Sequence, residues 1–253
     1  FEYTMWQTLV GAWPLAPERA QRFAEKATRE ARLRTSWRRP DPAYEAARTR
    51  WLGAVYADPE LVAEIAAFAT ALTPHGDRNS LAQLLIKLTA PGVPDFYQGS
   101  ELRDDALVDP DNRRPVDLAG RRRRLGELMG QDRLGADAAV RLGRDLGCAK
   151  LWTIHRVLAL RHRAPDLWAA PYRALAASGT HARRVFAFAR GNELVTVVPR
   201  LGVRAEGWAD TVLALGSGRW RDVLTGDDLV GGVQPVAGLW RKLPIALLWR
   251  AAP

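Results

Sequence analysis

The stretch of residues 89–117, TAPGVPDFYQGSELRDDALVDPDNRRPVD, constrains the fold of this chain more than any other part of it. The pair Pro91-Gly92 predicts the end of a helix, and the apolar run of residues 93–97 predicts a short strand directly after it. A polar loop rich in Asp, Asn and Arg follows. A buried strand that carries such a loop at its carboxyl end is typical of an α/β barrel, where ligand-binding groups stand at that end of the strands.

The loop after this apolar run carries the side chains that a sugar site needs. Carboxylates, an amide and planar guanidinium groups stand close together in residues 109–115, and each can bond hydroxyls in pairs. The alternative is a self-contained turn, in which Asp and Asn bond their own backbone and the arginines pair with the aspartates. Both interpretations can hold at once. The candidate sugar-binding side chains are Asp109, Asp111, Asn112, Arg113 and Arg114.

The amino-terminal part of the chain, up to about residue 88, predicts helices. Pro17 fits a first helical turn, and residues 41–42 and 58–59 each combine an N-cap aspartate with a first-turn proline. Residues 73–77 predict a break, after which one more helix leads into the strand. A helix followed by a strand is the order that an α/β barrel needs before its final strand.

The remainder of the chain changes character near Pro171. Before it, residues 150–163 place apolar side chains on one side and predict the closing helix of the barrel. After it, short strands separated by Gly-rich turns predict a small antiparallel β-sandwich that packs on the barrel. The expected domains are therefore residues 1–88, 89–170 and 171–253. The side chains expected to be buried in the last strand are Ile245, Leu247 or Leu248, and in part Trp249.

Composition excludes several classes of function. The net charge of +9 comes from arginines spread along the chain beside acids, and the dense run of residues 121–124 has no interleaved aromatics. A solvated helix face is therefore favoured over a phosphate-binding patch, and no nucleic-acid partner is expected. Apolar runs are too short to span a membrane, and the histidines lack metal-ligand spacing. The single cysteine, Cys148, excludes an intramolecular disulfide and suits the cytoplasm. No cofactor and no metal are expected.

Several long motifs resemble one known family. PGVPDFYQGSEL resembles the eighth-strand region of the α-amylase-type glycoside hydrolases, and VDPDNRRPVD is similar to the maltooligosyltrehalose synthase branch. YTMWQTLVGAWP, KATREARLRTSW and NSLAQLLIKLTAPG agree with that branch. The resemblance covers residues 3–128 most clearly. It departs from the family pattern at Arg32 and Arg34, where Lys and His are expected, and at Ser100 and Arg103, where Thr and Trp are.

The resemblance implies a fold and a reaction. The fold is the last part of a (β/α)8 TIM barrel with a helical subdomain, followed by the β-sandwich. The reaction is an intramolecular glucosyl transfer, which converts the reducing-end α-1,4 link of a maltooligosaccharide into an α,α-1,1 trehalose link. Implied partners are the maltooligosaccharide, the amino-terminal barrel of the same polypeptide and a trehalose-releasing hydrolase. The chain begins at Phe1 without an initiator Met or signal pattern, which indicates a carboxyl-terminal piece of a longer protein.

The resemblance also assigns roles to residues. It implies that the family's three catalytic acids lie upstream, so no catalytic residue is expected in this chain, and the chain alone is expected to be inactive. It places the 109–115 loop along the substrate, on the non-reducing side of the cleavage point. The other residues implied to bind substrate are Lys26, Ser36 and Trp37, and those implied to support the barrel mouth are Tyr97, Gln98 and Glu101.

Two rival interpretations remain open at this point. One is another α-amylase-type hydrolase or transglucosidase with the same final strand. The other is a noncatalytic carbohydrate-binding or scaffold piece, since the chain carries no recognisable catalytic pair.

Overall fold

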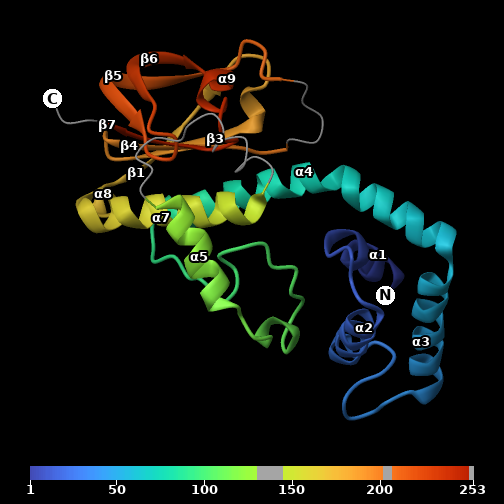
Figure 1. Ribbon diagram of the computed structural model, residues 1–253. Coiled ribbons are helices and arrows are strands. Elements are labelled where there is room, and N and C mark those ends of the chain that lie inside the picture. Colours follow the sequence, from blue (N-terminus) through green and yellow to red (C-terminus); the bar gives the residue numbers. More distant parts are fainter. Residues whose placement is uncertain (130–144, 202–206, 251–253) are drawn as a thin grey trace. The chain divides into compact units, whose positions relative to one another are not determined.

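A computed structural model of the protein describes residues 1–129, 145–201 and 207–250. The chain forms two compact units, each with a hydrophobic core of its own (Figure 1). Each unit is assembled from two separated stretches of sequence. Unit 1 consists of Phe1–Pro74 and Asp105–Pro115, and unit 2 consists of His75–Asp104 and Val116–Pro253.

Unit 1 is helical, and its helices begin where the sequence predicts. The Asp41 side chain accepts the Tyr44 N–H at 3.0 Å, and Asp58 accepts the N–H groups of Glu60 and Leu61 at 3.0 Å each. The helices are α1 (Glu2–Gly11), α2 (Pro17–Ala31), α3 (Pro42–Ala57) and the first half of α4 (Pro59–Thr89). Their buried core consists of Met5, Leu9, Leu15, Ala20, Ala24, Leu52, Val55 and Ile65.

The predicted break at residues 73–77 is wrong, because α4 continues through Pro74. A proline in a helix cannot donate to the carbonyl four residues before it, which is that of Thr70. Thr70 is exposed, so water can reach this carbonyl. Beside it, Thr73 Oγ1 donates to the Ala69 carbonyl at 2.9 Å. The lost hydrogen bond is therefore replaced by solvent, and the helix is maintained.

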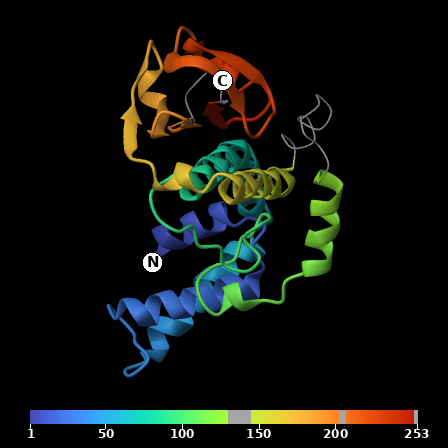
Figure 2. The ribbon, with the colours of Figure 1, turned by 90° about the vertical axis from the view of Figure 1, so that its left-hand side faces the viewer.

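The helices of unit 2 pack as a pair under a sheet. The helix predicted at residues 150–163 is confirmed as α7 (Leu146–Arg163), which begins earlier because Asp145 accepts the Cys148 N–H at 3.1 Å. Figures 1 and 2 both show α7 beside the second half of α4, beneath the sheet. The shorter helices of this unit are α5 (Leu118–Leu128) and α8 (Asp166–Ala169).

The strand predicted at residues 93–97 is absent from the structure. A strand needs the hydrogen-bonding groups of a neighbouring strand, and no strand in the described part of the chain pairs with this segment. Pro91 and Pro94 also remove two backbone donors. The side chains are consistent with this, because Val93 is 93% exposed and Asp95 is exposed as well.

The carboxyl-terminal part forms the antiparallel β structure that was predicted, but as one hydrogen-bonded sheet instead of the two sheets of a sandwich. The strand order is β1-β3-β4-β7-β5-β2, and β6 pairs with β5. β5 is long and its pairing shifts between Leu215 and Arg219, so the sheet curls, as Figure 2 shows. The strands are β1 (Tyr172–Leu175), β2 (Ala177–Ser178), β3 (Val185–Arg190), β4 (Leu194–Pro199), β5 (Val212–Asp222), β6 (Asp228–Pro235) and β7 (Ala246–Arg250).

Both faces of this sheet are covered. Alternate residues of β4 point to opposite sides: Leu194 and Val198 pack with α4 and α7, while Val195 and Val197 pack in a second core that includes Trp220. A short helix, α9 (Val236–Leu239), contributes to the second core. The predicted burial of the last strand is confirmed. Ile245, Leu247 and Leu248 are fully buried, and Trp249 is partly buried.

Candidate functional site

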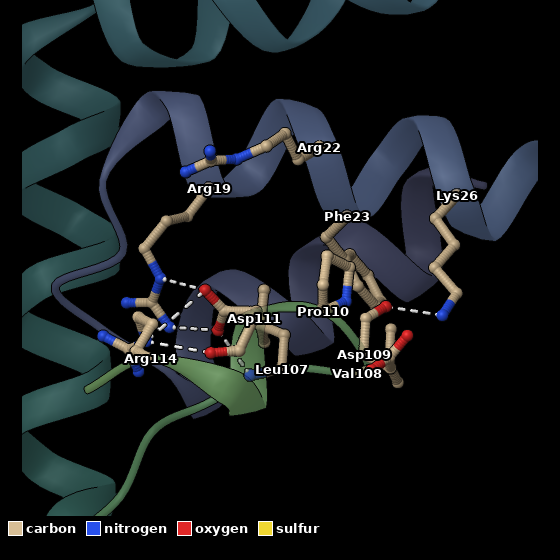
Figure 3. A pocket seen from close by; sticks show the side chains of 10 residues that line it. All are labelled: Arg19, Arg22, Phe23, Lys26, Leu107, Val108, Asp109, Pro110, Asp111 and Arg114. Atoms are coloured by element: carbon tan, nitrogen blue, oxygen red, sulfur yellow. Dashed lines mark hydrogen bonds and ion pairs between the residues drawn. The ribbon is translucent and has the colours of Figure 1, made fainter. Parts of the chain in front are cut away.

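Unit 1 contains a pocket of about 200 Å³ between α2 and the segment that follows Asp105 (Figure 3). The sequence of α2 creates one wall. Its small residues Ala20, Ala24 and Thr28 recur on the helical period and are buried. A second row at the same spacing faces the pocket and carries larger groups. These residues are Arg19, Arg22, Phe23 and Lys26.

Asp111 holds the opposite wall in place. Arg19 donates from Nε to Asp111 Oδ1 at 3.0 Å and from Nη2 to Oδ2 at 2.8 Å, a bidentate ion pair. The Leu107 N–H also donates to Asp111 Oδ2 at 2.8 Å, and Arg19 Nη2 reaches the Asp105 carbonyl at 2.8 Å. The bonds from Arg19 and then the Leu107 N–H lower the pKa of Asp111 from 3.8 to about 2. Asp111 is therefore an ionised anchor.

The rest of the loop is also held by contacts within the protein, as the interpretation of a self-contained turn predicted. Lys26 Nζ donates to the Asp109 carbonyl at 2.5 Å, and Arg113 forms an ion pair with the Asp109 side chain. Arg114 Nε donates to the Asp111 carbonyl at 3.0 Å. Three of the five predicted loop residues, Asp109, Asp111 and Arg114, thus line one pocket with Lys26. Asn112 lies in the same turn, and its buried Oδ1 has no hydrogen-bond partner in the described residues.

The pocket offers two kinds of surface to a ligand. Phe23, Leu107 and Val108 supply apolar area. Arg22 lines the same pocket without a hydrogen bond or ion pair to any described residue, so its guanidinium donors are available. An apolar surface with convergent donors suits a polar ring such as a sugar. Sequence reasoning missed Arg19, Arg22 and Phe23. The sequence pattern that could have identified them is the helical spacing that they share with Lys26, on the side of α2 opposite its row of small buried residues.

Ser36 and Trp37 do not line this pocket. They lie in the turn after α2, where Ser36 Oγ accepts the Arg39 N–H at 3.0 Å. Trp37 is 58% exposed, and the Arg29 guanidinium covers its ring at 4.7 Å. Arg29 also binds Glu45, and its two hydrogen bonds, together with that of the Thr35 hydroxyl, lower the pKa of Glu45 to about 2. The indole therefore has a cation on one face.

In unit 2, Glu101 supports a turn. Its Oε2 accepts the Gly99 N–H at 3.1 Å and the Arg121 Nε–H at 3.2 Å, while Arg121 Nη2 donates to the Gly99 carbonyl at 2.9 Å. The neighbouring Tyr97 and Gln98 are exposed. The ends of the basic run at residues 121–124 are thus paired with acids, because Arg124 also contacts Asp145 at 3.3 Å.

Two kinds of site are absent from the described residues. No helix in the described ranges has an apolar stretch long enough to cross a bilayer. No group of His, Cys, Asp or Glu in those ranges is arranged to hold a metal ion.

Replacing Arg19 by methionine is expected to loosen the 105–115 segment and to lower the free energy of unfolding by about 1–3 kcal/mol, because a charge-assisted bidentate pair is lost. Amide hydrogen exchange at Leu107 should accelerate. Arg22→Met is the matched control, since it changes the same pocket and breaks no bond, and it should leave both quantities unchanged. Equal effects of the two variants would contradict the anchoring role.

Acid should reduce the difference between wild type and Arg19→Met. The pKa of Asp111 is lower in the folded protein than its ordinary value of 3.8. Its stabilisation is therefore complete above that value and is lost as the pH falls toward about 2.

Comparison with known proteins shows what this chain is similar to in sequence and fold. No protein-family model matches the chain. A Mycobacterium tuberculosis protein, provisionally named a maltooligosyl trehalose synthase, is 39% identical over 256 residues, which cover 97% of this chain and 31% of the relative. The solved maltooligosyltrehalose synthase of Arthrobacter ramosus is 38% identical, with a TM-score of 0.88 over 99% of this chain and 32% of that one. A Sulfolobus tokodaii structure, named a hypothetical maltooligosyl trehalose synthase, gives a TM-score of 0.73 at 26% identity, over 98% of this chain and 32% of that one.

In sequence and in fold, the chain matches one part of these relatives, which are named as synthases. It belongs to the maltooligosyltrehalose synthase family. The chain spans about a third of the length of the relatives that it matches.

Proposed function

We propose that this chain is the carboxyl-terminal part of a maltooligosyltrehalose synthase that isomerises maltooligosaccharides within a cytoplasmic route to trehalose. The observation that carries the proposal is the identity of 38–39% with members of that family over nearly the whole chain. The whole protein would cleave the last α-1,4 link of the substrate and join the released glucose again through an α,α-1,1 bond.

The reaction divides the work between two parts of the polypeptide. A retaining glycosyl transfer needs two carboxyl groups about 5–5.5 Å apart, one as nucleophile and one as acid and base. Asp111 cannot be that acid, because its carboxylate is held ionised by Arg19. We assign the catalytic acids to the preceding polypeptide. We assign to this chain the binding of substrate hydroxyls and the exclusion of water, which would otherwise hydrolyse the glycosyl-enzyme.

The pocket of unit 1 is the sugar-binding surface that we propose. Phe23 would lie against the apolar face of a glucose ring, and the free donors of Arg22 would bond its hydroxyls. Lys26 and the side chains of the 109–114 turn keep the wall in place and share in those bonds. For Ser36 and Trp37 we propose a contact with the reducing-end glucose, by the exposed part of the indole.

The remaining expectations about domain organisation are part of the same proposal. Residues 93–97 would become the last strand of a (β/α)8 barrel once the preceding strands supply hydrogen-bonding partners, and Tyr97, Gln98 and Glu101 would then support its mouth. Residues 1–88, 89–170 and 171–253 would be the helical, barrel and β domains. The turn that Glu101 already braces supports this assignment.

Incubation of maltopentaose with a longer protein that contains this chain tests the proposal. The expected product is maltotriosyltrehalose, so reducing ends should disappear while little free glucose accumulates. The 253-residue chain by itself should convert nothing, because we assign the catalytic acids to the preceding polypeptide. A hydrolase would raise the number of reducing ends instead, and conversion by the short chain would contradict the division of labour. Binding of maltopentaose without any conversion by the longer protein would favour a noncatalytic carbohydrate-binding role.

A further inference from the structure

Unit 2 contains a separate pocket of about 380 Å³ in its β-sheet. Residues from β1, β3, β4, β5 and β7 line it, together with the turn between β3 and β4. Its volume falls in the range of about 300–1,000 Å³ that is common for small-molecule sites. The polar side chains at this pocket are Arg173, Asn192, Ser217 and Arg250.

The strand register shows that both arginines point to the face of the sheet that carries the second core. Arg173 lies opposite Ala189, and Arg250 lies opposite Trp220. Cross-strand partners share a face, and Ala189 and Trp220 are both buried in that core. Two guanidinium groups from different strands therefore meet an apolar floor at one pocket.

Within the part of the chain that the structure describes, neither arginine has a partner for its charge. In the described ranges, no hydrogen bond or ion pair engages either guanidinium, and no carboxylate lines the pocket. Glu193 contributes only its backbone carbonyl, which accepts the Arg250 N–H at 2.7 Å. This differs from the pocket of unit 1, where Arg19 is neutralised by Asp111. A neutral sugar would leave the two charges of the unit 2 pocket without a counter-charge.

We propose that this pocket binds the phosphate group of a small organic phosphate. A phosphate carries up to two negative charges and presents several acceptor oxygens, which match two planar guanidinium forks. Asn192 and Ser217 add neutral donors at the same opening. The apolar floor at Leu175 and Trp220 leaves room for the organic part of the ligand. This site is independent of the proposed synthase function.

Phosphorus NMR and calorimetry on the 253-residue chain, at constant ionic strength, test the site with inorganic phosphate, glucose 6-phosphate and glucose as probes. Both phosphates should bind and glucose should not. Arg173→Gln and Arg250→Gln should each weaken binding by about tenfold or more, because each removes a charge-assisted contact. Arg219→Gln is the matched control. It removes the same charge from an exposed position of β5 that does not line the pocket, and it should bind as wild type does.

The outcomes separate the proposal from its rivals. Equal weakening in all three variants would show a general effect of charge and would overturn the site. The absence of phosphate binding by the wild-type chain would overturn it too, as would a loss confined to one of the two pocket arginines. Tighter binding of glucose 6-phosphate than of inorganic phosphate would support the organic phosphate. Equal affinity for glucose 6-phosphate and inorganic phosphate would overturn the assignment to an organic phosphate and would leave a site for inorganic phosphate alone. Circular dichroism of each variant checks folding. Arg173 is exposed on an edge strand, so the Arg173→Gln variant still tests the site if Arg250→Gln does not fold.

Discussion

Unit 2 is expected to be less stable at about pH 8 than at about pH 5, by about 1.4 kcal/mol, through the single residue Asp222, and replacing this residue by asparagine should abolish that difference. Asp222, the last residue of β5, is 4% exposed. Burial raises the pKa of its carboxyl from 3.8 to about 6, although hydrogen bonds from Leu224, Leu247 and Thr225 oppose that shift. The carboxyl is therefore protonated in the folded protein under mildly acidic conditions.

The sign follows from proton binding. Between its ordinary pKa of 3.8 and the raised value near 6, the folded state of Asp222 holds a proton that the unfolded state has lost. Stability therefore falls as the pH rises through this window, and above it the ionised carboxylate remains a constant cost. Asparagine imitates the protonated acid, since it keeps an acceptor for the Leu224 N–H and supplies a donor toward Thr225. Asp222→Asn should then be as stable as wild type in acid and more stable near neutral pH.

Urea denaturation followed by tryptophan fluorescence at several pH values measures the effect. The difference between wild type and Asp222→Asn isolates this carboxyl from other groups, such as His155, whose pKa is lowered by burial. Asp222→Ala should cost about 2–5 kcal/mol in acid, because it leaves two buried backbone N–H groups without an acceptor. Asp228→Ala removes an exposed acid from β6 and serves as the control. A parallel pH dependence in wild type and Asp222→Asn would contradict a titrating Asp222.

Local signals in the sequence predicted the parts of the fold that depend on local chemistry. Helix starts at Pro42 and Pro59 were predictable because a capping aspartate directly precedes each proline, and the start at Pro17 was predictable from the proline alone. The paired strands β3 and β4 were predictable because a Gly-Asn turn joins two alternating runs. These are interactions between residues that are close in sequence.

The missed features depend on partners that are far away in sequence. Residues 93–97 have the composition of a strand, but a strand needs a neighbour to pair with, and none of the described strands pairs with this segment. The curl of the sheet depends on a shift in the pairing of β5 that no residue type announces. At the pocket of unit 1, the loop aspartates were recognisable as ligand-binding groups. Their anchor Arg19 was not, because 92 positions separate it from Asp111.

Replacing Arg190 by methionine is expected to destabilise unit 2 by about 2–4 kcal/mol. Arg190 ends β3 and is 4% exposed. Among the described residues, its guanidinium binds no carboxylate. Instead it donates to the Ala170 carbonyl at 3.0 Å, the Thr89 carbonyl at 3.4 Å and the Trp168 carbonyl. These carbonyls lie at the carboxyl ends of α4 and α8, where the helix dipoles favour a cation.

Lysine should be no milder a replacement than methionine, at about 3–5 kcal/mol. Methionine removes the buried charge together with its donors, so relief of desolvation offsets part of the loss of three hydrogen bonds. Lysine keeps a charge in the same buried place, yet a single ammonium cannot point at carbonyls in three directions. Denaturant unfolding measures the free energy of unfolding of both variants, and Arg183→Met, at an exposed position, is the control. If Arg190→Lys proves clearly the milder change, the helix ends need only a positive charge, and the planar geometry of the guanidinium contributes little.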